Sequence, residues 1–172
     1  FGDEIHIGTI NFDDPAMQEQ FVAWLKRKGM TKEDLGVPPE QAVLADRANP
    51  RFAWYGQLFN NEVMFDQFRR DTEVAREVIG PQVETGANYS PHVPPQYYGN
   101  LPQYVEIFKQ NGMSMYWTED YIFSVAQPPQ FISWMFAMMH CACKYNKQII
   151  HMYVMPHAPG QTAEFLRRSM VY

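Results

Sequence analysis

The chain has 172 residues, of which 46% are hydrophobic and 19% are charged. This composition is typical of a folded domain and excludes a disordered chain. The formal net charge is -5, and the 14 lysine and arginine residues form no basic run, so we expect no nucleic-acid partner. No stretch reaches the roughly 18 consecutive apolar residues of a membrane span, so we expect no membrane partner either. The sequence indicates no compartment.

The first predicted element is a helix over Pro15–Lys28. Asp14 is placed to cap its first turn, and Gly29 ends it. A short capped helical turn is predicted at Thr31–Leu35. A long helix is predicted over Gly56–Ile79, because apolar residues recur there at steps of three and four.

Strands alternate with helices in the rest of the chain. Strands are predicted over Gln82–Ala87, Met113–Trp117 and Gln148–Met155. Helices are predicted over Leu101–Asn111, Pro128–Tyr145 and Thr162–Tyr172. The second of these helices is apolar nearly all round, so we expect it to be buried. The alternation predicts βα units around a parallel sheet, an α/β fold. No glycine-rich phosphate loop follows a strand, which disfavours a dinucleotide-binding Rossmann fold.

Polar and aromatic residues collect where the predicted strands end. They are Asn88, Tyr89, Trp117, Thr118, Glu119, Asp120, Tyr121 and His157, and Asp3 and Glu4 occupy the end of a further potential strand. The active sites of α/β barrels lie at the carboxyl ends of the strands. Aromatic rings stack on sugar faces, and carboxylates transfer protons to and from glycosidic oxygens. These residues therefore predict a carbohydrate site.

Each of these features also has a purely structural interpretation. Asp3 and Glu4 could be surface charges, Glu119 and Asp120 could cap a loop, and Asn88 could form a turn. His151 and His157 match no standard ligand spacing, so we predict no metal site and no cofactor. The two cysteines, Cys141 and Cys143, face apart on a helix, so we expect no disulfide between them. We expect both thiols to be core residues.

Five segments together carry a family resemblance. They are Phe1–Ile5, Phe21–Lys26, Val83–Tyr89, Met113–Tyr121 and Lys147–Pro156. In this order they resemble an Asn-Glu motif closing the fourth barrel strand, an F-x-x-W-L helix, and the fifth, sixth and seventh strands. On these segments the chain resembles the β-galactosidase-like glycoside hydrolases, family 42 in particular, which are retaining (β/α)8 barrels.

The resemblance implies a partial (β/α)8 TIM barrel, from about the fourth to the seventh strand. Residues 1–172 would then form a single α/β segment, an excerpt of a larger TIM-barrel catalytic domain. Because a partial barrel leaves two open sheet edges, we expect the remainder of the barrel to be a partner, in the same chain or another. A homo-oligomer would also be compatible with these open edges.

The resemblance further implies hydrolysis of a β-galactoside or a related glycan. Glu4 matches the general acid/base of the family, although Asp3 stands where the family has Asn. The family nucleophile, a Glu ending the seventh strand, has no counterpart, and Tyr153 lies near its position. Substrate contacts are expected from Asp3, Asn88, Tyr89, Trp117, Tyr121, Tyr153 and His157.

Several alternatives follow from the missing glutamate. Glu119 or Asp120, one strand away, could be the second catalytic carboxylate, and a tyrosine nucleophile as in sialidases is a minor alternative. The site could instead have lost its chemistry, leaving a glycan-binding or structural assembly protein. A third hypothesis is an unrelated α/β enzyme that uses His157 and the aromatic loops.

Overall fold

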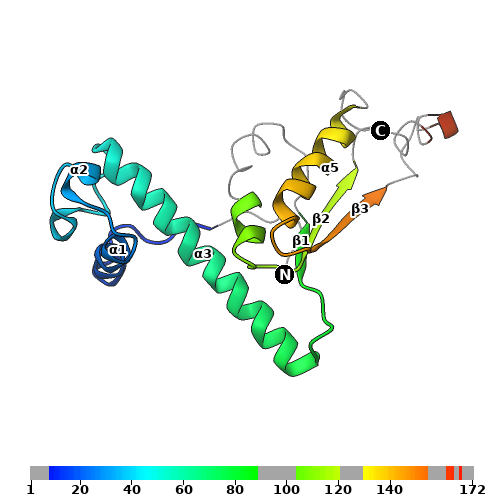
Figure 1. The fold of residues 1–172 in the computed structure, drawn as a ribbon, viewed down its shortest axis with the longest axis horizontal. Helices are drawn as coiled ribbons and strands as arrows, with labels where there is room; N and C mark the ends of the chain where they lie inside the picture. The colour runs from blue at the N-terminus through cyan, green and yellow to red at the C-terminus, as the bar shows by residue number, and fades with distance from the viewer. Residues whose placement is uncertain (1–7, 89–103, 121–129, 155–161, 165–166, 168–172) are drawn as a thin grey trace. The chain divides into compact units, whose positions relative to one another are not determined.

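The computed structural model describes residues 8–88, 104–120, 130–154, 162–164 and 167. Figure 1 shows the elements in chain order: α1 (Pro15–Arg27), α2 (Lys32–Leu35), η1 (Pro39–Gln41), α3 (Pro50–Ile79), β1 (Gly86–Asn88), β2 (Met115–Asp120), α5 (Gln130–Cys143) and β3 (Ile149–Val154). Residues 104–109 are also helical. The chain is therefore a mixed α/β protein. None of these helices is long and apolar enough to cross a membrane, within the residues described.

The chain divides into two compact units. The first, Ile7–Asp66, is here called the helical unit. The second contains the described residues from Gln67 onward and is here called the sheet unit. The helix α3 begins in the first unit and ends in the second.

The start of α1 agrees with its sequence signals. Asp14 is the N-cap, and its Oδ1 accepts a hydrogen bond from the Ala16 N–H at 2.8 Å. This bond satisfies one of the free amides of the first turn. In α2, Asp34 accepts hydrogen bonds from the backbone N–H and the hydroxyl of Thr31, at 2.8 and 2.9 Å. Gly36 follows α2 with φ 83°, a left-handed conformation that glycine adopts at little cost.

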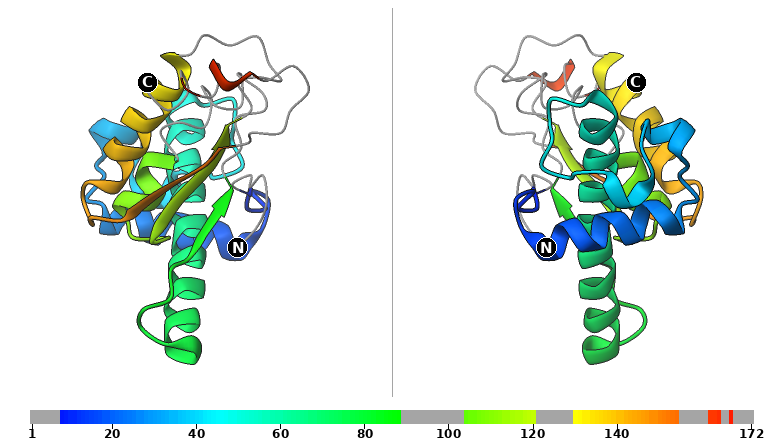
Figure 2. Two further views of the ribbon diagram at one scale, coloured as in Figure 1. Left: turned by 90° about the vertical axis from the view of Figure 1, so that its right-hand side faces the viewer. Right: turned by 90° about the vertical axis from the view of Figure 1, so that its left-hand side faces the viewer.

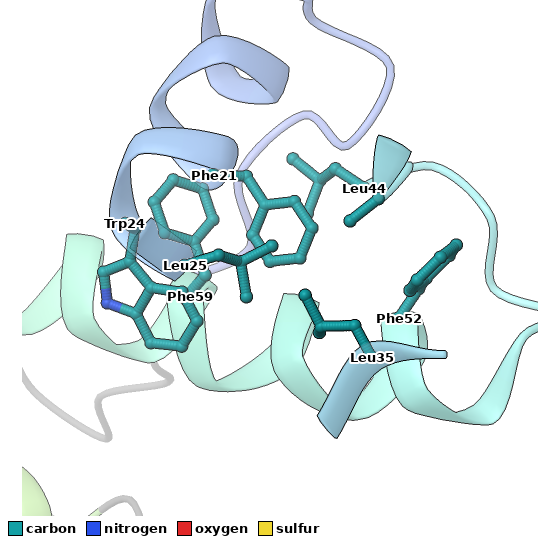
Figure 3. Close-up of a cluster of buried hydrophobic side chains, with 8 residues drawn as sticks. Phe21, Trp24, Leu25, Leu35, Leu44, Phe52 and Phe59 are labelled. Atoms are coloured by element: carbon teal, nitrogen blue, oxygen red, sulfur yellow. The ribbon is translucent and has the colours of Figure 1, made fainter. Parts of the chain in front are cut away.

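An aromatic and aliphatic core holds the helical unit together. Figure 3 shows its side chains gathered from α1, α2, the segment before α3, and α3 itself. The core residues are Phe21, Trp24, Leu25, Leu35, Ala42, Leu44, Phe52 and Phe59. The rings of Phe21 and Phe59 lie 5.5 Å apart in a tilted arrangement, within the range of favourable aromatic pairs.

Side-chain amides join the irregular segments of the helical unit to its helices. Gln18 donates to the Ala42 carbonyl at 2.9 Å and accepts from the Leu44 N–H at 2.7 Å. Asn60 accepts from the Ile10 N–H at 2.8 Å. Each amide thus satisfies backbone groups that no helix or strand satisfies.

The long helix α3 begins earlier than predicted. It starts at Pro50 rather than Gly56, because proline is compatible with the first turn of a helix. The Asn49 Oδ1 accepts from the Arg51 N–H at 3.0 Å. Leu58 and Ile79 are two of the recurring apolar residues on which this helix was predicted, and they are 38% and 65% exposed, so the predicted apolar face is partly wrong.

The three strands of the sheet unit form one parallel sheet in the order β1-β2-β3. The predicted parallel sheet is confirmed, but its boundaries differ. β1 covers Gly86–Asn88 rather than Gln82–Ala87, and β2 runs on to Asp120 rather than ending at Trp117. As a result, polar residues that we expected to follow the strands lie within them. A Cβ at Gly86 would meet the Met115 carbonyl oxygen at 2.7 Å, so this position of β1 requires glycine.

Helices cover one face of this sheet. Figures 1 and 2 show α5 and helical residues 104–109 on that face. Tyr116 of β2 stacks on Phe108 with ring centroids 4.8 Å apart. In α5, the buried residues include Met135, Met139 and Ala142, whereas Cys141 is exposed. The expectation that this helix and both thiols are buried is therefore wrong in part, because only one side of α5 packs on the sheet.

A cluster of buried hydroxyl groups lies near the start of the strands in the sheet unit. The Thr72 hydroxyl lies 2.8 Å from that of Thr85 and donates to the Gly112 carbonyl at 2.9 Å. The Ser114 hydroxyl accepts from the Thr85 N–H at 2.8 Å. These bonds join α3 to the segments that lead into β1 and β2.

Candidate functional site

The candidate site lies at the carboxyl end of the sheet. Since the strands are parallel, their carboxyl ends meet at one edge. The register pairs Asn88 with Trp117, Trp117 with His151, and Glu119 with Tyr153. The three strands thus bring together positions that lie up to 65 residues apart in the sequence, from 88 to 153.

The two faces of the sheet differ in character. Tyr116 and Thr118 are buried on the face that the helices cover. Trp117 lies on the opposite face, where its ring makes an edge contact with His151 at a centroid distance of 6.4 Å. Tyr153 is 47% exposed and His151 is also exposed. We call the side carrying Trp117, His151 and Tyr153 the open face.

The register distinguishes the two candidate carboxylates of β2. Glu119 is two residues beyond Trp117, so strand alternation gives it the face of Trp117. Asp120 is two residues beyond Thr118, so the same alternation gives its position the face that the helices cover. Glu119 and Tyr153 are neighbouring positions across β2 and β3. Only Glu119 therefore falls at a position on the open face.

Asn88 takes a different place from a turn residue. It is the last residue of β1, is 1% exposed, and pairs in register with Trp117. The turn interpretation is therefore wrong.

Trp117 is half-buried, and its indole Nε1 is buried with no hydrogen-bond partner among the described residues. Buried donors normally have partners, so this N–H is available to a group that completes the site.

Five predicted site residues lie outside the described residues: Asp3, Glu4, Tyr89, Tyr121 and His157. The structure adds His151, which sequence analysis considered only as a metal ligand. Its signal was the even spacing from Tyr153, which puts both residues on one face of a strand. Within the described ranges, no group of three His, Cys, Asp or Glu side chains could hold a metal ion.

A concave feature lies in the helical unit, between α1 and α3. This groove has a volume of about 260 Å³ and is lined by Gln20, Ala23, Trp24, Arg27, Phe59, Glu62, Val63 and Asp66. On each helix the lining residues recur at i, i+3, i+4 and i+7, one helical face. The groove is thus the seam between two packed helices.

Glu62 is the electrostatic centre of this groove. Partial burial by itself raises the pKa of the Glu62 carboxyl, but its neighbours outweigh that effect and leave the pKa below its ordinary value. The largest contribution comes from Lys28, whose Nζ lies 2.7 Å from Oε2. The N–H dipole of the buried Trp24 indole and the charge of Arg27 add to it. The charge of Glu62 is therefore balanced within the unit.

Burial also inactivates the thiol of Cys143. Desolvation raises its pKa to about 11, so it is almost entirely protonated at neutral pH and is a poor nucleophile.

Comparison with protein-family models, with curated proteins and with solved structures finds no match to the chain. The functional argument therefore depends on the site itself.

Proposed function

We propose that the chain is part of a (β/α)8-barrel glycoside hydrolase acting on a β-galactoside or a related glycan. The observation that supports the proposal is the register of β2 and β3, in which Glu119 and Tyr153 are paired backbone positions near the carboxyl end of the sheet. A carboxylate at the carboxyl end of a parallel sheet, next to aromatic residues, is suited to glycoside chemistry.

The order of the strands supports the barrel. β1, β2 and β3 are adjacent in chain order and all parallel, and helices cover one face. Consecutive strands of a barrel have this arrangement, with the uncovered face directed inward. The remainder of the barrel, in the same chain or another, would cover the open face and pair with the outer edges of the described sheet.

The proposed roles follow from the two faces. Glu119 is the carboxylate of β2 that acts on the glycosidic bond, and Asp120 is set aside because it has the parity of the covered face. Glu4, which lies outside the described residues, protonates the leaving oxygen as the resemblance implies. Trp117 stacks on a sugar ring, so the substrate is held against the open face.

The test is hydrolysis of an aryl-glycoside panel by the full-length protein and four variants. We expect Glu4→Gln and Glu119→Gln to lower kcat by on the order of 10³-fold or more, because each removes a group needed in the transition state. Asp120→Asn should change kcat by less than about tenfold. Glu84→Gln, at an exposed position before β1, is the matched control and should be neutral. Unimpaired hydrolysis by Glu119→Gln, or no hydrolysis of any glycoside by the wild type, would refute the proposal.

The second candidate is a non-catalytic glycan-binding protein. The sequence of β3, IIHMYV, contains no carboxylate, and this observation favours it. Under this alternative, calorimetry would detect glycan binding that Trp117→Ala abolishes, while no variant or wild-type protein would release product. Turnover that requires Glu119 would exclude it.

A further inference from the structure

We infer that the groove between α1 and α3 binds a neutral sugar of the size of one monosaccharide. All residues that line this groove belong to the helical unit, so the site shares no residue with the open face of the sheet. The inference does not depend on the proposed hydrolysis, because it concerns binding alone.

The groove contains a donor that forms no hydrogen bond. Trp24 lines the groove and is 4% exposed, and its Nε1 is buried with no hydrogen-bond partner among the described residues. Figure 3 shows the indole nitrogen on the side of the ring that faces away from the other labelled side chains of the core. Because those core side chains are apolar, a partner for this N–H has to come from the groove.

An acceptor lies close to this donor. The dipole of the Trp24 N–H acts on the Glu62 carboxylate, although the two groups are not in hydrogen-bond geometry. The Lys28 Nζ lies 2.7 Å from the Glu62 Oε2. A carboxylate can accept about four hydrogen bonds, so Glu62 keeps lone pairs for a further donor.

A hydroxyl group is suited to join this donor to this acceptor. Its oxygen accepts from the indole N–H, and its own proton goes to the carboxylate. An ammonium group could not accept from the indole. Insertion of the hydroxyl requires the Glu62 carboxylate to move outward. This movement costs little, because Lys28 and Arg27 hold the carboxylate with side chains that are 42% and 65% exposed.

The charges around the groove favour a neutral ligand. Arg27, Glu62 and Asp66 line the groove, and Lys28 pairs with Glu62, so two positive charges balance two negative ones. A charged ligand meets no complementary net charge in these surroundings. A neutral molecule with several hydroxyls can instead donate to the carboxylates and accept from the guanidinium.

The size and the walls of the groove suit one sugar ring. Its volume of about 260 Å³ is several times the roughly 30 Å³ of a water molecule and lies just below the range of drug-sized sites, about 300–1,000 Å³. Ala23, Phe59 and Val63 add apolar wall beside the polar groups. A sugar presents C–H groups on its ring face and hydroxyls around its edge, and both find partners here.

The test is a titration of the full-length protein, labelled with ¹⁵N at its tryptophan indoles, with D-galactose, D-glucose and D-mannose. We expect at least one sugar to shift the indole N–H signal of Trp24 saturably. The signal of Trp54, an exposed tryptophan outside the groove lining, should not move. Inorganic phosphate, spermidine and L-alanine are the ionic counter-probes and should leave the Trp24 signal unchanged.

The Trp24 signal is identified by its loss in Trp24→Phe. If that variant does not fold, variants of the other tryptophans, such as Trp54→Phe, identify the signal by elimination.

Two variants test the groove without changing a buried core residue. Ala23→Leu fills the groove from an exposed position of α1 and should weaken sugar binding on the order of tenfold or more. Glu62→Leu removes the acceptor and should have an effect of similar size. Ala16→Leu on α1 and Glu73→Leu on α3 are the matched controls, at exposed positions outside the groove lining, and should bind like the wild type.

Every other outcome overturns the inference. A Trp24 signal that no sugar shifts would refute it, and a shift caused by a counter-probe alone would assign the groove to an ion. Equal binding by the wild type, Ala23→Leu and Glu62→Leu would place the sugar elsewhere. A sugar that shifts only the Trp117 signal would refute the groove and support the open face. A Trp24 shift in a protein that hydrolyses no glycoside would uphold this inference while the proposed hydrolase fails.

Discussion

The helical unit and the sheet unit both bury aromatic side chains, but the sheet unit also exposes a tyrosine near the carboxyl end of its sheet. In the helical unit, Phe21, Trp24 and Phe59 are each at most 4% exposed and contact one another. In the sheet unit, Tyr116 is buried in the same manner, but Tyr153 on the open face is half exposed. Packing accounts for the first group and does not account for Tyr153.

Polar side chains do not divide in the same way, since the Nε1 atoms of Trp24 and Trp117 are both buried with no hydrogen-bond partner among the described residues. Gln18 and Asn60 of the helical unit bond backbone groups inside that unit. The Trp117 indole of the sheet unit has no hydrogen-bond partner among the described residues. Satisfied polar groups stabilise a fold, whereas an unsatisfied donor at a strand end indicates a place for a further group. The comparison teaches that the 15% aromatic content combines buried core rings with exposed rings.

The largest expected effect breaks the aromatic core. Phe21→Ala should lower the free energy of unfolding by about 3–5 kcal/mol, because it leaves a cavity among Trp24, Leu25 and Phe59. Tyr153→Ala should change the stability by only about 0.5 kcal/mol or less. Urea unfolding followed by circular dichroism measures both values.

Leu58→Ala serves as the control in the helical unit, since Leu58 is an exposed residue of α3. It should resemble Tyr153→Ala and not Phe21→Ala. If Tyr153→Ala proved as destabilising as Phe21→Ala, the open face would be a structural core, and the distinction between the two units would fail.

The second effect tests whether polar groups of the sheet unit are also structural away from its carboxyl end. Thr72→Val keeps the shape of a buried side chain but leaves the Gly112 carbonyl without its donor. The expected cost is about 1–3 kcal/mol, the usual range for a buried unsatisfied group. Thr9→Val, at an exposed position, is the matched control and should cost less than about 0.5 kcal/mol. Equal costs for the two variants would show that the hydroxyl cluster does not stabilise the sheet unit.

Local signals were sufficient to predict part of this fold. The Asp14 cap, the three-four periodicity and the terminating Gly29 defined α1 to within one residue. Alternating strands and helices predicted the parallel sheet. These features depend on residues close together in the chain, which a single sequence displays.

The errors arose where distant segments decide the structure. A proline such as Pro50 is equally compatible with a break between elements and with the first residue of a helix, and here it is the first residue of α3. β2 extends to Asp120 because β3 pairs with it that far. The distinction between Glu119 and Asp120 depends on the parity of the strand and on which face the helices cover. No local pattern specifies the register that pairs Glu119 with Tyr153.

The smallest expected effect concerns Glu62 and tests whether its charge stabilises the helical unit. Because its folded-state pKa is lowered, the ionised carboxylate favours the folded protein. This stabilisation is complete above the unfolded pKa, about 4.3, and is lost as the pH falls through the lower folded value. The difference in melting temperature between the wild type and Glu62→Gln should thus be present at pH 7 and shrink below about pH 4.

Glu40→Gln, at an exposed position, should show no such pH-dependent difference. Added salt should also reduce the Glu62 difference, because solvent screens a partly exposed pair. A difference that is independent of pH would mean that the charge of Glu62 does not stabilise the fold.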